Sequence, residues 1–418
     1  MTVVGGGVSG NAAARLLLSR GAVVRISDSA TEDKVTQISG VAYELGGHTD
    51  AILQDEMLVL SPGVDPRHPV LAKARAKGMP ICGEVELAAC ALRKKPKYIA
   101  ITGTNGKTTT TALVGHILRG AAKTVFVGGN IGEPLSTLAM SEEAVEIAVL
   151  ELSSYQCEGL ITFDPDVAVW LNLAPDHLDR YATVADYADA KARLLQLQSS
   201  THTSVINERD PYCLTVVKSL STKVRRFSVD KPTDYELEKT PLLGVHNREN
   251  QRAAIAACEA LGIAHDAIQK GLDTFQGVEH RIEKVTVSDG ITWYNDSKGT
   301  NDDAASKALA AVAAPIVWLA GGKDKGGGYT LSRKAAIGKV KLAILYGAAA
   351  PLISDAMKGM IKVERVDTLD QAVARAREIA VSGDSVLLSP ACSSFDQFNN
   401  YEERGRKFKA LVQGCTHD

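Results

Sequence analysis

The stretch KYIAITGTNGKTTTTALVGHIL (97–118) constrains the fold of this 418-residue chain more than any other. An apolar run of strand length leads into a loop with Gly103 and Gly106, and a helix-forming segment follows directly. A strand, a glycine turn and a helix in this order form the repeating unit of parallel sheets. Strand-like runs alternate with helical ones through nearly the whole chain, so we predict an α/β protein with mainly parallel sheets.

Length and two changes in composition predict three domains. A chain of 418 residues is too long for one ordinary core. The basic, proline-containing segment LRKKPKY (92–98) separates a helical stretch from a new strand, and FQGVEHRIEKV (275–285) marks a weaker seam. We therefore expect domains at 1–93, 94–277 and 278–418, each of a usual domain size.

The composition excludes several classes of protein. Apolar residues make up 45% and charged residues 23%, as in globular proteins, and 47 basic residues nearly balance 49 acidic ones. This balance gives no indication of nucleic acid or an acidic membrane as partner. The seven cysteines are scattered without a C-x-x-C pair, which favours reduced thiols over disulfides or zinc. Without a membrane-length apolar run or a signal-peptide pattern, we expect a cytoplasmic chain.

A glycine turn of the form G-x-G-x-x-G occupies residues 5–10, between a short apolar strand and a helix. Such a turn brings backbone N–H groups at a helix N-terminus close to phosphate. Asp28 ends the next strand, where its carboxylate can accept hydrogen bonds from a ribose or a base. The loop LSPGVDP (60–66) follows a further strand at the same sheet edge. The turn alone leaves open a packing role, a dinucleotide site or a site for another nucleotide.

The loop TGTNGKTTT (102–110) predicts a second phosphate site, although two residues separate its glycines where four are usual. Loop N–H groups and the helix dipole can hold phosphates, Lys107 can neutralise them, and the Thr108 hydroxyl can reach Mg²⁺. A plain glycine turn with an exposed lysine is the alternative. Gly-Lys-Thr-Thr at a strand-to-helix junction favours the phosphate site.

Three further strand-like runs end on Asn130, on Glu151 and, a few residues beyond the strand, on His177. Because ligands bind outside the carboxyl ends of parallel strands, we expect these side chains to converge with Lys107 and Thr108. Glu151 and His177 are then plausible ligands of a hard cation that also contacts phosphate. Either residue alone would more often be a capping or solvated group.

The segment TVADYADAKARLLQL (183–197) reads as a helix with Thr183 and Asp186 as an N-terminal capping pair. From spacing alone, Lys191 is expected to be a solvated helix lysine.

The motifs TGTNGKTTT, LELSSYQ, LNLAPDHLDRY, YADAKARLL and GVHNRENQRAA resemble, in this order, those of the Mur ligases. These enzymes are ATP-dependent amide ligases of peptidoglycan precursor synthesis. The resemblance extends through NDSKGTN (295–301) to SPACSSFDQFNNYEERG (389–405), which is most similar to the D-glutamate-adding members. The Asp-Asn-Pro-Arg motif of the diaminopimelate-adding relatives does not occur in the sequence.

The resemblance implies a Rossmann-like N-terminal domain for the UDP end of the acceptor, a central P-loop-type ATPase domain with a mainly parallel sheet, and a Rossmann-like C-terminal domain for the amino acid. It implies ATP and Mg²⁺, UDP-N-acetylmuramoyl-L-alanine and D-glutamate as substrates, and a monomer in the bacterial cytoplasm. ATP would convert the acceptor carboxylate to an acyl phosphate, which the amine attacks while the C-terminal domain closes over the cleft.

The resemblance also assigns residues. Those for ATP are Gly103, Thr104, Asn105, Gly106, Lys107, Thr108, Thr109, Asn247, Asn250, Arg281 and Asp296, with His280 beside them. Those for the UDP end are Gly7, Ser9, Asp28, Ser61, Gly63 and Asn130. Those for the amino acid are Thr300, Lys325, Ser394 and Tyr401. Those for metal are Thr108, Glu151, His177 and Lys191, the last as a carbamate. The catalytic set is Lys107, His177, Lys191 and Lys298, with His177 open as base or metal ligand.

Three other interpretations of the sequence stay open. A nicotinamide dehydrogenase would use the N-terminal glycines and Asp28 but leaves the central phosphate loop unexplained. A folate polyglutamate ligase gives no reason for the N-terminal turn. A nucleotide-binding regulator would use the same loops without catalysis.

Overall fold

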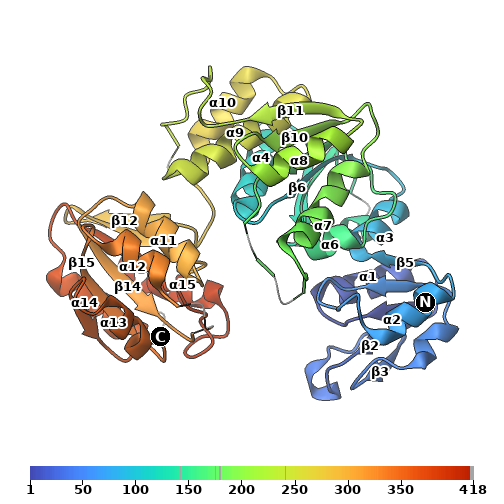
Figure 1. The fold of residues 1–418 in the computed structure, drawn as a ribbon, viewed down its shortest axis with the longest axis horizontal. Helices are drawn as coiled ribbons and strands as arrows, with labels where there is room; N and C mark the ends of the chain where they lie inside the picture. The colour runs from blue at the N-terminus through green and yellow to red at the C-terminus, as the bar shows by residue number, and fades with distance from the viewer. Residues whose placement is uncertain are drawn as a thin grey trace. The chain divides into compact units, whose positions relative to one another are not determined.

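The computed structural model describes residues 1–141, 143–174, 176–177, 180–240, 242–324, 326 and 328–414 (Figure 1). Contacts divide the chain into two compact units. The first comprises Met1–Lys239 and Glu249–Phe275, and the second comprises Thr240–Arg248 and Gln276–Asp418. The first unit contains two sheets and the second contains one.

The N-terminal sheet has the order β3-β2-β1-β4-β5, and every pair of neighbours is parallel. Its strands are β1 Thr2–Val4, β2 Val24–Asp28, β3 Val41–Leu45, β4 Leu58–Leu60 and β5 Ile81–Gly83. Its helices are α1 Val8–Ser19, α2 Pro69–Ala76 and α3 Glu84–Ala91, with short 3₁₀ turns η1 Glu32–Lys34 and η2 Asp50–Gln54. Since β2 and β4 both flank β1, the turn after β1 and the loop after β4 lie at one sheet edge, as predicted.

The middle sheet has the order β11-β10-β9-β6-β8-β7 and is also parallel throughout. Its strands are β6 Lys97–Thr102, β7 Val125–Gly129, β8 Ile147–Glu151, β9 Val167–Trp170, β10 Thr203–Asn207 and β11 Lys223–Phe227. Its helices are α4 Lys107–Gly120, α5 Leu135–Met140, α6 Ser154–Glu158, α7 Val184–Gln196, α8 Pro211–Val216, α9 Val245–Ala260 and α10 His265–Thr274, with a 3₁₀ turn η3 Val217–Ser219. Burial of both faces explains why β6, β8 and β9 read as continuous apolar runs.

The N-terminal and middle sheets belong to one unit because their helices share a core. Leu16 of α1 and Val85 of α3 are buried in the same cluster as Leu135 and Leu138 of α5. Glu86 of α3 reinforces this joint, because its carboxylate accepts hydrogen bonds from the backbone N–H groups of residues 161–163. The chain therefore presents the loops of both sheets on one compact body.

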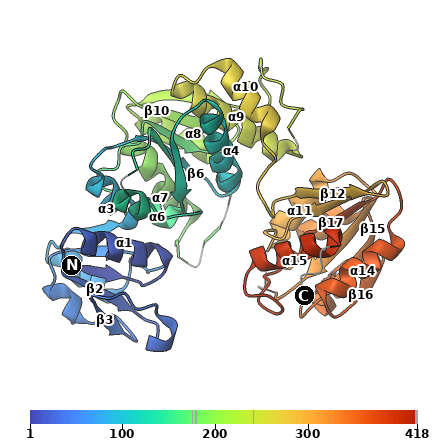
Figure 2. The ribbon, with the colours of Figure 1, turned by 180° about the vertical axis from the view of Figure 1, so that it is seen from behind.

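The C-terminal sheet has the order β12-β13-β17-β14-β15-β16. Figure 2 shows this part of the chain from behind. Its strands are β12 Glu283–Ser288, β13 Ile291–Asn295, β14 Ile316–Gly321, β15 Val340–Tyr346, β16 Val363–Arg365 and β17 Ser385–Leu388. Its helices are α11 Asp302–Ala311, α12 Thr330–Ala336, α13 Ala350–Met357, α14 Leu369–Ile379 and α15 Tyr401–Gln413. Alternate residues of β14 enter opposite cores: Trp318 packs with α11, α12 and α13, and Leu319 packs with α14 and α15.

The predicted fold class, α/β with three domains and mainly parallel sheets, is confirmed. The exact boundaries 93/94 and 277/278 stay predictions. One strand departs from the expected parallel pattern: β12 pairs with β13 antiparallel, across the two-residue turn Asp289–Gly290. None of the described helices is long and apolar enough to cross a membrane.

Candidate functional site

One cavity of the first unit collects the six residues expected to bind the UDP end. It has a volume of about 620 Å³ and lies where the turn after β1, the loop after β4 and the end of β7 meet. Its lining includes Gly7, Ser9, Asp28, Ser61, Gly63 and Asn130. We refer to this space as the acceptor cavity.

The last glycine of the N-terminal turn, Gly10, lets the two loops of the acceptor cavity pack together. A Cβ at Gly10 would lie 1.9 Å from the carbonyl oxygen of Gly5 and 2.5 Å from Ser61 Oγ. Ser61 Oγ donates to the same Gly5 carbonyl at 2.6 Å. Asp28 holds the turn from the other side, accepting from the N–H of Gly6 at 2.5 Å. These contacts set the shape of the cavity before any ligand binds.

Two histidines of the acceptor cavity were missed by sequence reasoning. The rings of His48 and His68 are 5.2 Å apart in an edge-on arrangement, and both line the cavity. Burial and the neighbouring His68 lower the pKa of His48, which favours its neutral ring. Neither residue lies at a motif spacing, so the sequence carried no signal for them.

The predicted phosphate loop of the middle domain has the backbone that its glycines allow. Gly103 and Gly106 have φ values of +151° and +87°. Lys107 begins α4 and folds back over the loop, donating from Nζ to the carbonyls of Gly103 (2.8 Å) and Thr104 (2.9 Å). Among the described residues no side chain caps α4, so its first-turn amides face the loop in the manner of an anion site.

Neighbouring segments hold this loop in place. Thr104 Oγ1 accepts from the N–H of Ala174 at 3.0 Å, and the N–H of Asn105 donates to Asn172 Oδ1 at 2.9 Å. Asn250 of α9 packs against the loop so closely that a Cβ at Gly106 would lie 2.2 Å from its Oδ1. The predicted pair Asn247 and Asn250 lies one helical turn apart on α9, and both side chains are buried. Thr108 and Thr109 follow in the first turn of α4 and are also buried.

Glu151 ends β8 with its carboxylate almost fully buried at 2% exposure. Asn130 Nδ2 donates to Oε1 at 2.8 Å, while Oε2 has no hydrogen-bond partner among the described residues. An ionised carboxylate oxygen buried without a partner is costly unless a cation or a donor reaches it. Because β6 and β8 pair at Ile101 and Glu151, this oxygen lies at the sheet edge where the phosphate loop begins.

His177 follows β9 and adopts a positive φ of +55°, a conformation that is strained for a residue with a side chain. Its Nδ1 shares a hydrogen bond of 2.9 Å with the Tyr155 hydroxyl, and Nε2 lies 3.8 Å from Asp176 Oδ2. The ring of Tyr187 lies 5.8 Å away, and its hydroxyl contacts Thr104 Oγ1 at 3.2 Å. Ring contacts thus connect His177 to the phosphate loop.

The expectation that Lys191 is solvated is wrong. The capping pair of Thr183 and Asp186 starts α7 as predicted, but Lys191 is only 1% exposed. Its Nζ donates to the Gly103 carbonyl at 3.0 Å and lies 4.6 Å from the centre of the Tyr187 ring. The four-residue steps Tyr187, Lys191 and Leu195 place the lysine on the apolar helix face, a signal that periodicity offered.

Lys191 is consequently an unusual amine. Within the described part of the chain no carboxylate is paired with it. Burial, and next the nearby charge of Lys107, lower the pKa of Lys191 to about 7. A substantial fraction of this side chain is then the neutral, nucleophilic amine at neutral pH.

The second unit contains the remaining predicted residues. Asp296 is buried after β13, where Oδ2 accepts from Ser389 Oγ (2.7 Å) and Oδ1 accepts from the N–H of Ile282 (3.2 Å). Burial raises the pKa of Asp296 to about 7, although the nearby Arg281 charge opposes this. Lys298 follows, with Nζ 5.2 Å from the centre of the Tyr401 ring.

The structure places Thr300 two residues beyond Lys298, to whose carbonyl its N–H donates at 2.9 Å. Ser394 is buried in the loop after β17. Arg404 ties that loop to Ser297: its guanidinium is fully buried and donates to the carbonyls of Ser297 (2.8 Å) and Cys392 (3.2 Å). Sequence reasoning missed Arg404. The predicted residue Lys325 lies outside the described residues.

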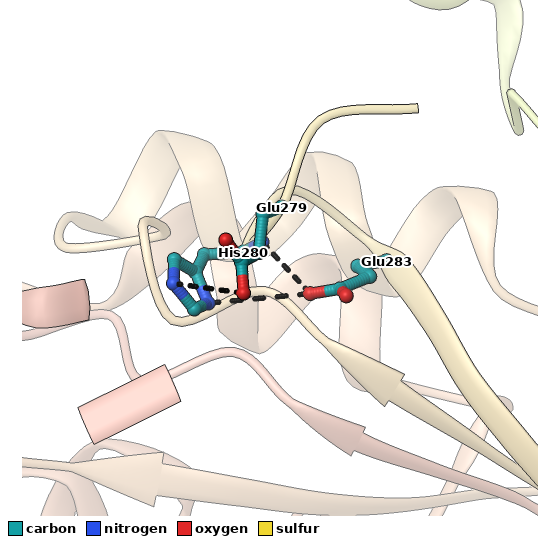
Figure 3. Close-up of side chains that lie close together, drawn as sticks. All are labelled: Glu279, His280 and Glu283. Carbon is teal, nitrogen blue, oxygen red and sulfur yellow. Dashed lines mark hydrogen bonds and ion pairs between the residues drawn. The ribbon is translucent and has the colours of Figure 1, made fainter. Parts of the chain in front are cut away.

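Figure 3 shows a cluster of Glu279, His280 and Glu283 at the start of β12. The N–H of His280 donates to Glu283 Oε2 at 3.0 Å, and its Nε2 lies 3.8 Å from Glu279 Oε1. Lys409 Nζ already neutralises both carboxylates, at 2.9 Å from Glu279 and 2.6 Å from Glu283. We therefore regard the cluster as support for the His280 backbone, which has a positive φ of +64°, and assign it no metal.

Comparison with protein families agrees with this geometry. Residues 1–83 match the MurD-like N-terminal domain of Mur ligases, residues 101–258 match the Mur ligase middle domain, and residues 280–392 match the glutamate ligase domain of Mur ligases. The glycine turn, the phosphate loop and Asp296 fall within these three matches in that order.

Individual proteins match over the full length. A UDP-N-acetylmuramoylalanine–D-glutamate ligase of Myxococcus xanthus is 42% identical and covers 97% of this chain and 96% of its own. An enzyme of the same name from Alkaliphilus metalliredigens is 41% identical, covering 98% and 97%. The crystal structure of a UDP-N-acetylmuramate–alanine ligase from Thermotoga maritima shares the fold, with a TM-score of 0.63, 21% identity and 99% coverage of both chains.

Proposed function

This chain belongs to the Mur ligase family, and we propose on that premise that it joins D-glutamate to UDP-N-acetylmuramoyl-L-alanine with conversion of ATP to ADP and phosphate. Members of the family are ATP-dependent amide ligases of peptidoglycan precursor synthesis, and the chain is a ligase of this kind. The choice of D-glutamate follows the names of relatives that are about 40% identical over nearly the whole chain.

The observation that carries the proposal is the contact between Asn130 and Glu151. Asn130 lines the acceptor cavity, and its amide holds one oxygen of Glu151 at the edge where the phosphate loop begins. The proposed site for a nucleotide-sugar acceptor and the proposed site for ATP phosphates are thus adjacent within one compact unit. A ligase that must bring an acceptor carboxylate to a γ-phosphate requires this adjacency.

The residues of the first unit fit a magnesium ion. Glu151 Oε2 is a buried carboxylate oxygen without a partner among the described residues, and Mg²⁺ prefers oxygen ligands. Thr108, Glu151 and His177 are the residues proposed to hold it together with phosphate oxygens. When bound, Mg²⁺ supplies positive charge that neutralises the phosphates.

Lys191 is proposed to act as a carbamate. The ammonium first loses one proton, and the neutral amine then adds to CO₂, forming a C–N bond and releasing a second proton, so that a cationic side chain becomes an anionic one. The change removes the repulsion from Lys107 and gives the buried site an oxygen anion. Burial without a paired carboxylate favours this reaction, because desolvation and the charge of Lys107 destabilise the ammonium form of Lys191.

The reaction is proposed to run in two steps. A carboxylate oxygen of the L-alanyl group attacks the γ-phosphorus of ATP, the bond to the β-phosphate oxygen breaks, and ADP leaves. The amine of D-glutamate then attacks the acyl phosphate, loses a proton and expels phosphate. Lys107 and Lys298 are proposed to offset phosphate charge in these steps.

His177 is proposed to take part through Nε2, because Tyr155 already engages Nδ1. Nε2 is available either to a metal or to the amine proton, and it cannot serve both at the same time.

Other residues are proposed to bind the amino acid and the adenosine. Those for the amino acid are Thr300, Ser394 and Tyr401, and those for the adenosine are Asn247, Asn250, Arg281 and Asp296. We also propose a cytoplasmic monomer.

The direct test is ATP consumption with UDP-N-acetylmuramoyl-L-alanine and a panel of amino acids. The proposal predicts ADP release and an amide product with D-glutamate alone. Product with L-lysine or diaminopimelate would assign the chain to a different branch of the family. Phosphate release that needs neither acceptor nor amino acid would favour a nucleotide-binding regulator, and hydride transfer from NADH would favour a dehydrogenase.

A further inference from the structure

Arg180 lies in the loop after β9, three residues beyond His177, and its side chain is only 11% exposed. Its Nη1 donates to two carbonyls of the loop after β4, Pro62 at 2.9 Å and Val64 at 3.1 Å. Both of these residues line the acceptor cavity. One side of the guanidinium therefore holds the backbone of the loop to which the acceptor is proposed to bind.

The other side of Arg180 faces the group that holds His177. The guanidinium carbon lies 4.0 Å from the centre of the Tyr155 ring, and the Tyr155 hydroxyl bonds to His177 Nδ1 at 2.9 Å. A guanidinium over an aromatic face is attracted by the ring and fixes its plane. Glu158 completes the arrangement, with one oxygen 2.5 Å from Arg180 Nη2 and the other 2.6 Å from the Tyr181 hydroxyl.

Two features of Arg180 suggest a role beyond holding the two domains together: a donor without a partner in the described part of the chain, and an adjacent cavity. Its Nε has no hydrogen-bond partner among the described residues, and it lines a cavity of about 150 Å³ together with Pro62, Val64 and Tyr155. A buried side-chain donor is usually hydrogen-bonded. The unused donor and the adjacent space allow the guanidinium to follow a displacement of the loop.

Contacts other than those of Arg180 also join the N-terminal and middle domains. Glu86 accepts backbone hydrogen bonds across the joint, and the backbones of Gly83 and Gly159 touch there, with Gly83 N–H donating to the Gly159 carbonyl at 2.9 Å. Arg20 also crosses it, donating from Nη2 to the carbonyls of Ala91 (3.2 Å) and Ala139 (2.9 Å). Several contacts besides those of Arg180 therefore hold the N-terminal and middle domains together.

We propose that Arg180 is a positioning residue that couples occupation of the acceptor cavity to the orientation of His177, so that the UDP acceptor and the magnesium–nucleotide bind cooperatively. A shift of the carbonyls at 62 and 64 moves the guanidinium, which moves the Tyr155 ring and with it the imidazole. The strained backbone of His177 makes its orientation responsive to such a contact. This inference rests on the proposed function for the identities of the two ligands.

The test is a binding cycle without turnover. Calorimetry measures the affinity for the Mg²⁺ complex of the β,γ-imido analogue of ATP, with and without saturating UDP-N-acetylmuramoyl-L-alanine. The wild-type chain should bind the analogue about tenfold more tightly with acceptor present, within the 5- to 150-fold range usual for coupled sites. By thermodynamic reciprocity, the analogue should tighten acceptor binding by the same factor.

Arg180→Met should bind each ligand alone within about threefold of wild type but reduce the coupling factor to near one. Arg180→Lys, which keeps charge but loses the planar fork, should retain part of it. Tyr155→Phe should also reduce the coupling, and adding it to Arg180→Met should have no further effect. Arg20→Met is the matched control, since it removes another arginine of the same joint and should leave the coupling intact.

Coupling that survives in Arg180→Met, or that disappears equally in Arg20→Met, overturns the inference, as does a wild-type chain without cooperativity. If Arg180→Met fails to fold, Tyr155→Phe and Arg180→Lys decide the matter. Failure of the proposed function is distinguishable, because it would show as no binding of the UDP acceptor or no ligation by the wild-type chain.

Discussion

Replacing Lys191 with methionine tests the assignment of a carbamate most sharply. Methionine keeps a long apolar side chain but removes the amine that burial penalises. A fall in the pKa of Lys191 from 10.5 to about 7, at ~1.4 kcal/mol for each tenfold change in acidity, corresponds to a cost of about 5 kcal/mol for the buried ammonium. In CO₂-free buffer, the methionine variant should therefore be more stable than wild type at pH 7 and below.

The sign of the pH dependence follows from the lowered pKa of Lys191. Between pH 7 and 10.5 the unfolded amine is protonated and the folded amine is not, so the unfolded state binds more protons. The free energy of unfolding of the wild type should rise with pH in this window by up to ~1.4 kcal/mol per pH unit relative to Lys191→Met. Lys218→Met, at an exposed lysine of the same unit, should show no such difference.

Added bicarbonate converts this stability difference into a test of the chemistry. Carbamylation removes the buried ammonium, so bicarbonate should stabilise the wild type at pH 7–8 and leave Lys191→Met unchanged. With ¹³C-labelled bicarbonate, a carbamate resonance should appear in the wild type alone. The methionine variant should lose ligase activity roughly 10- to 100-fold or more, with partial rescue by short-chain carboxylates. Equal bicarbonate responses, no carbamate resonance and full activity of Lys191→Met would refute the reasoning.

Three further predictions concern other residues of the two units. Glu151→Gln removes the charge on the unpartnered oxygen, so a Mg²⁺ titration of activity should require roughly 10- to 100-fold more metal; an unchanged titration would exclude Glu151 as a ligand. Gly106→Ala forces a Cβ into Asn250 Oδ1 at φ +87° and should abolish nucleotide binding in calorimetry, whereas Gly120→Ala, which meets open space, should bind normally. Burial raises the pKa of Asp296 to about 7, so wild-type stability should fall as pH rises from about 4 to 7. Thermal unfolding of Asp296→Asn at the same pH values should show no such loss of stability. Equal pH dependence of stability in the wild type and the variant would contradict the raised pKa of Asp296.

Much of the fold was predictable because local patterns sufficed for it. Continuous apolar runs bounded by glycine or polar residues predicted β6, β8 and β9, and the sheet geometry then placed Glu151 beside the phosphate loop. The antiparallel pairing of β12 with β13 was missed, although the sequence carried a signal for it: Asp289–Gly290 between two strand-like runs is typical of a β-hairpin, and a two-residue turn can join only antiparallel strands.

In the candidate site, the sequence indicated residues only where they belong to a motif with a fixed spacing. Lys191 was misjudged because a lysine is ordinarily solvated, although its spacing to Tyr187 placed it on the buried face. Arg180 and Arg404 gave no signal at all. Their contacts with residues 62–64 and with residue 297 join segments that are more than a hundred positions apart in the chain, and only the folded structure brings these segments together.

The reaction proposed for this chain takes the acceptor carboxylate through an acyl phosphate. It is tested most directly with UDP-N-acetylmuramoyl-L-alanine carrying ¹⁸O in the alanyl carboxylate, incubated with ATP, Mg²⁺ and D-glutamate. Phosphorus NMR of the released phosphate should show one ¹⁸O per phosphate, with release dependent on both acceptor and D-glutamate. Phosphate without ¹⁸O, or release that is independent of D-glutamate, would contradict an acyl phosphate intermediate.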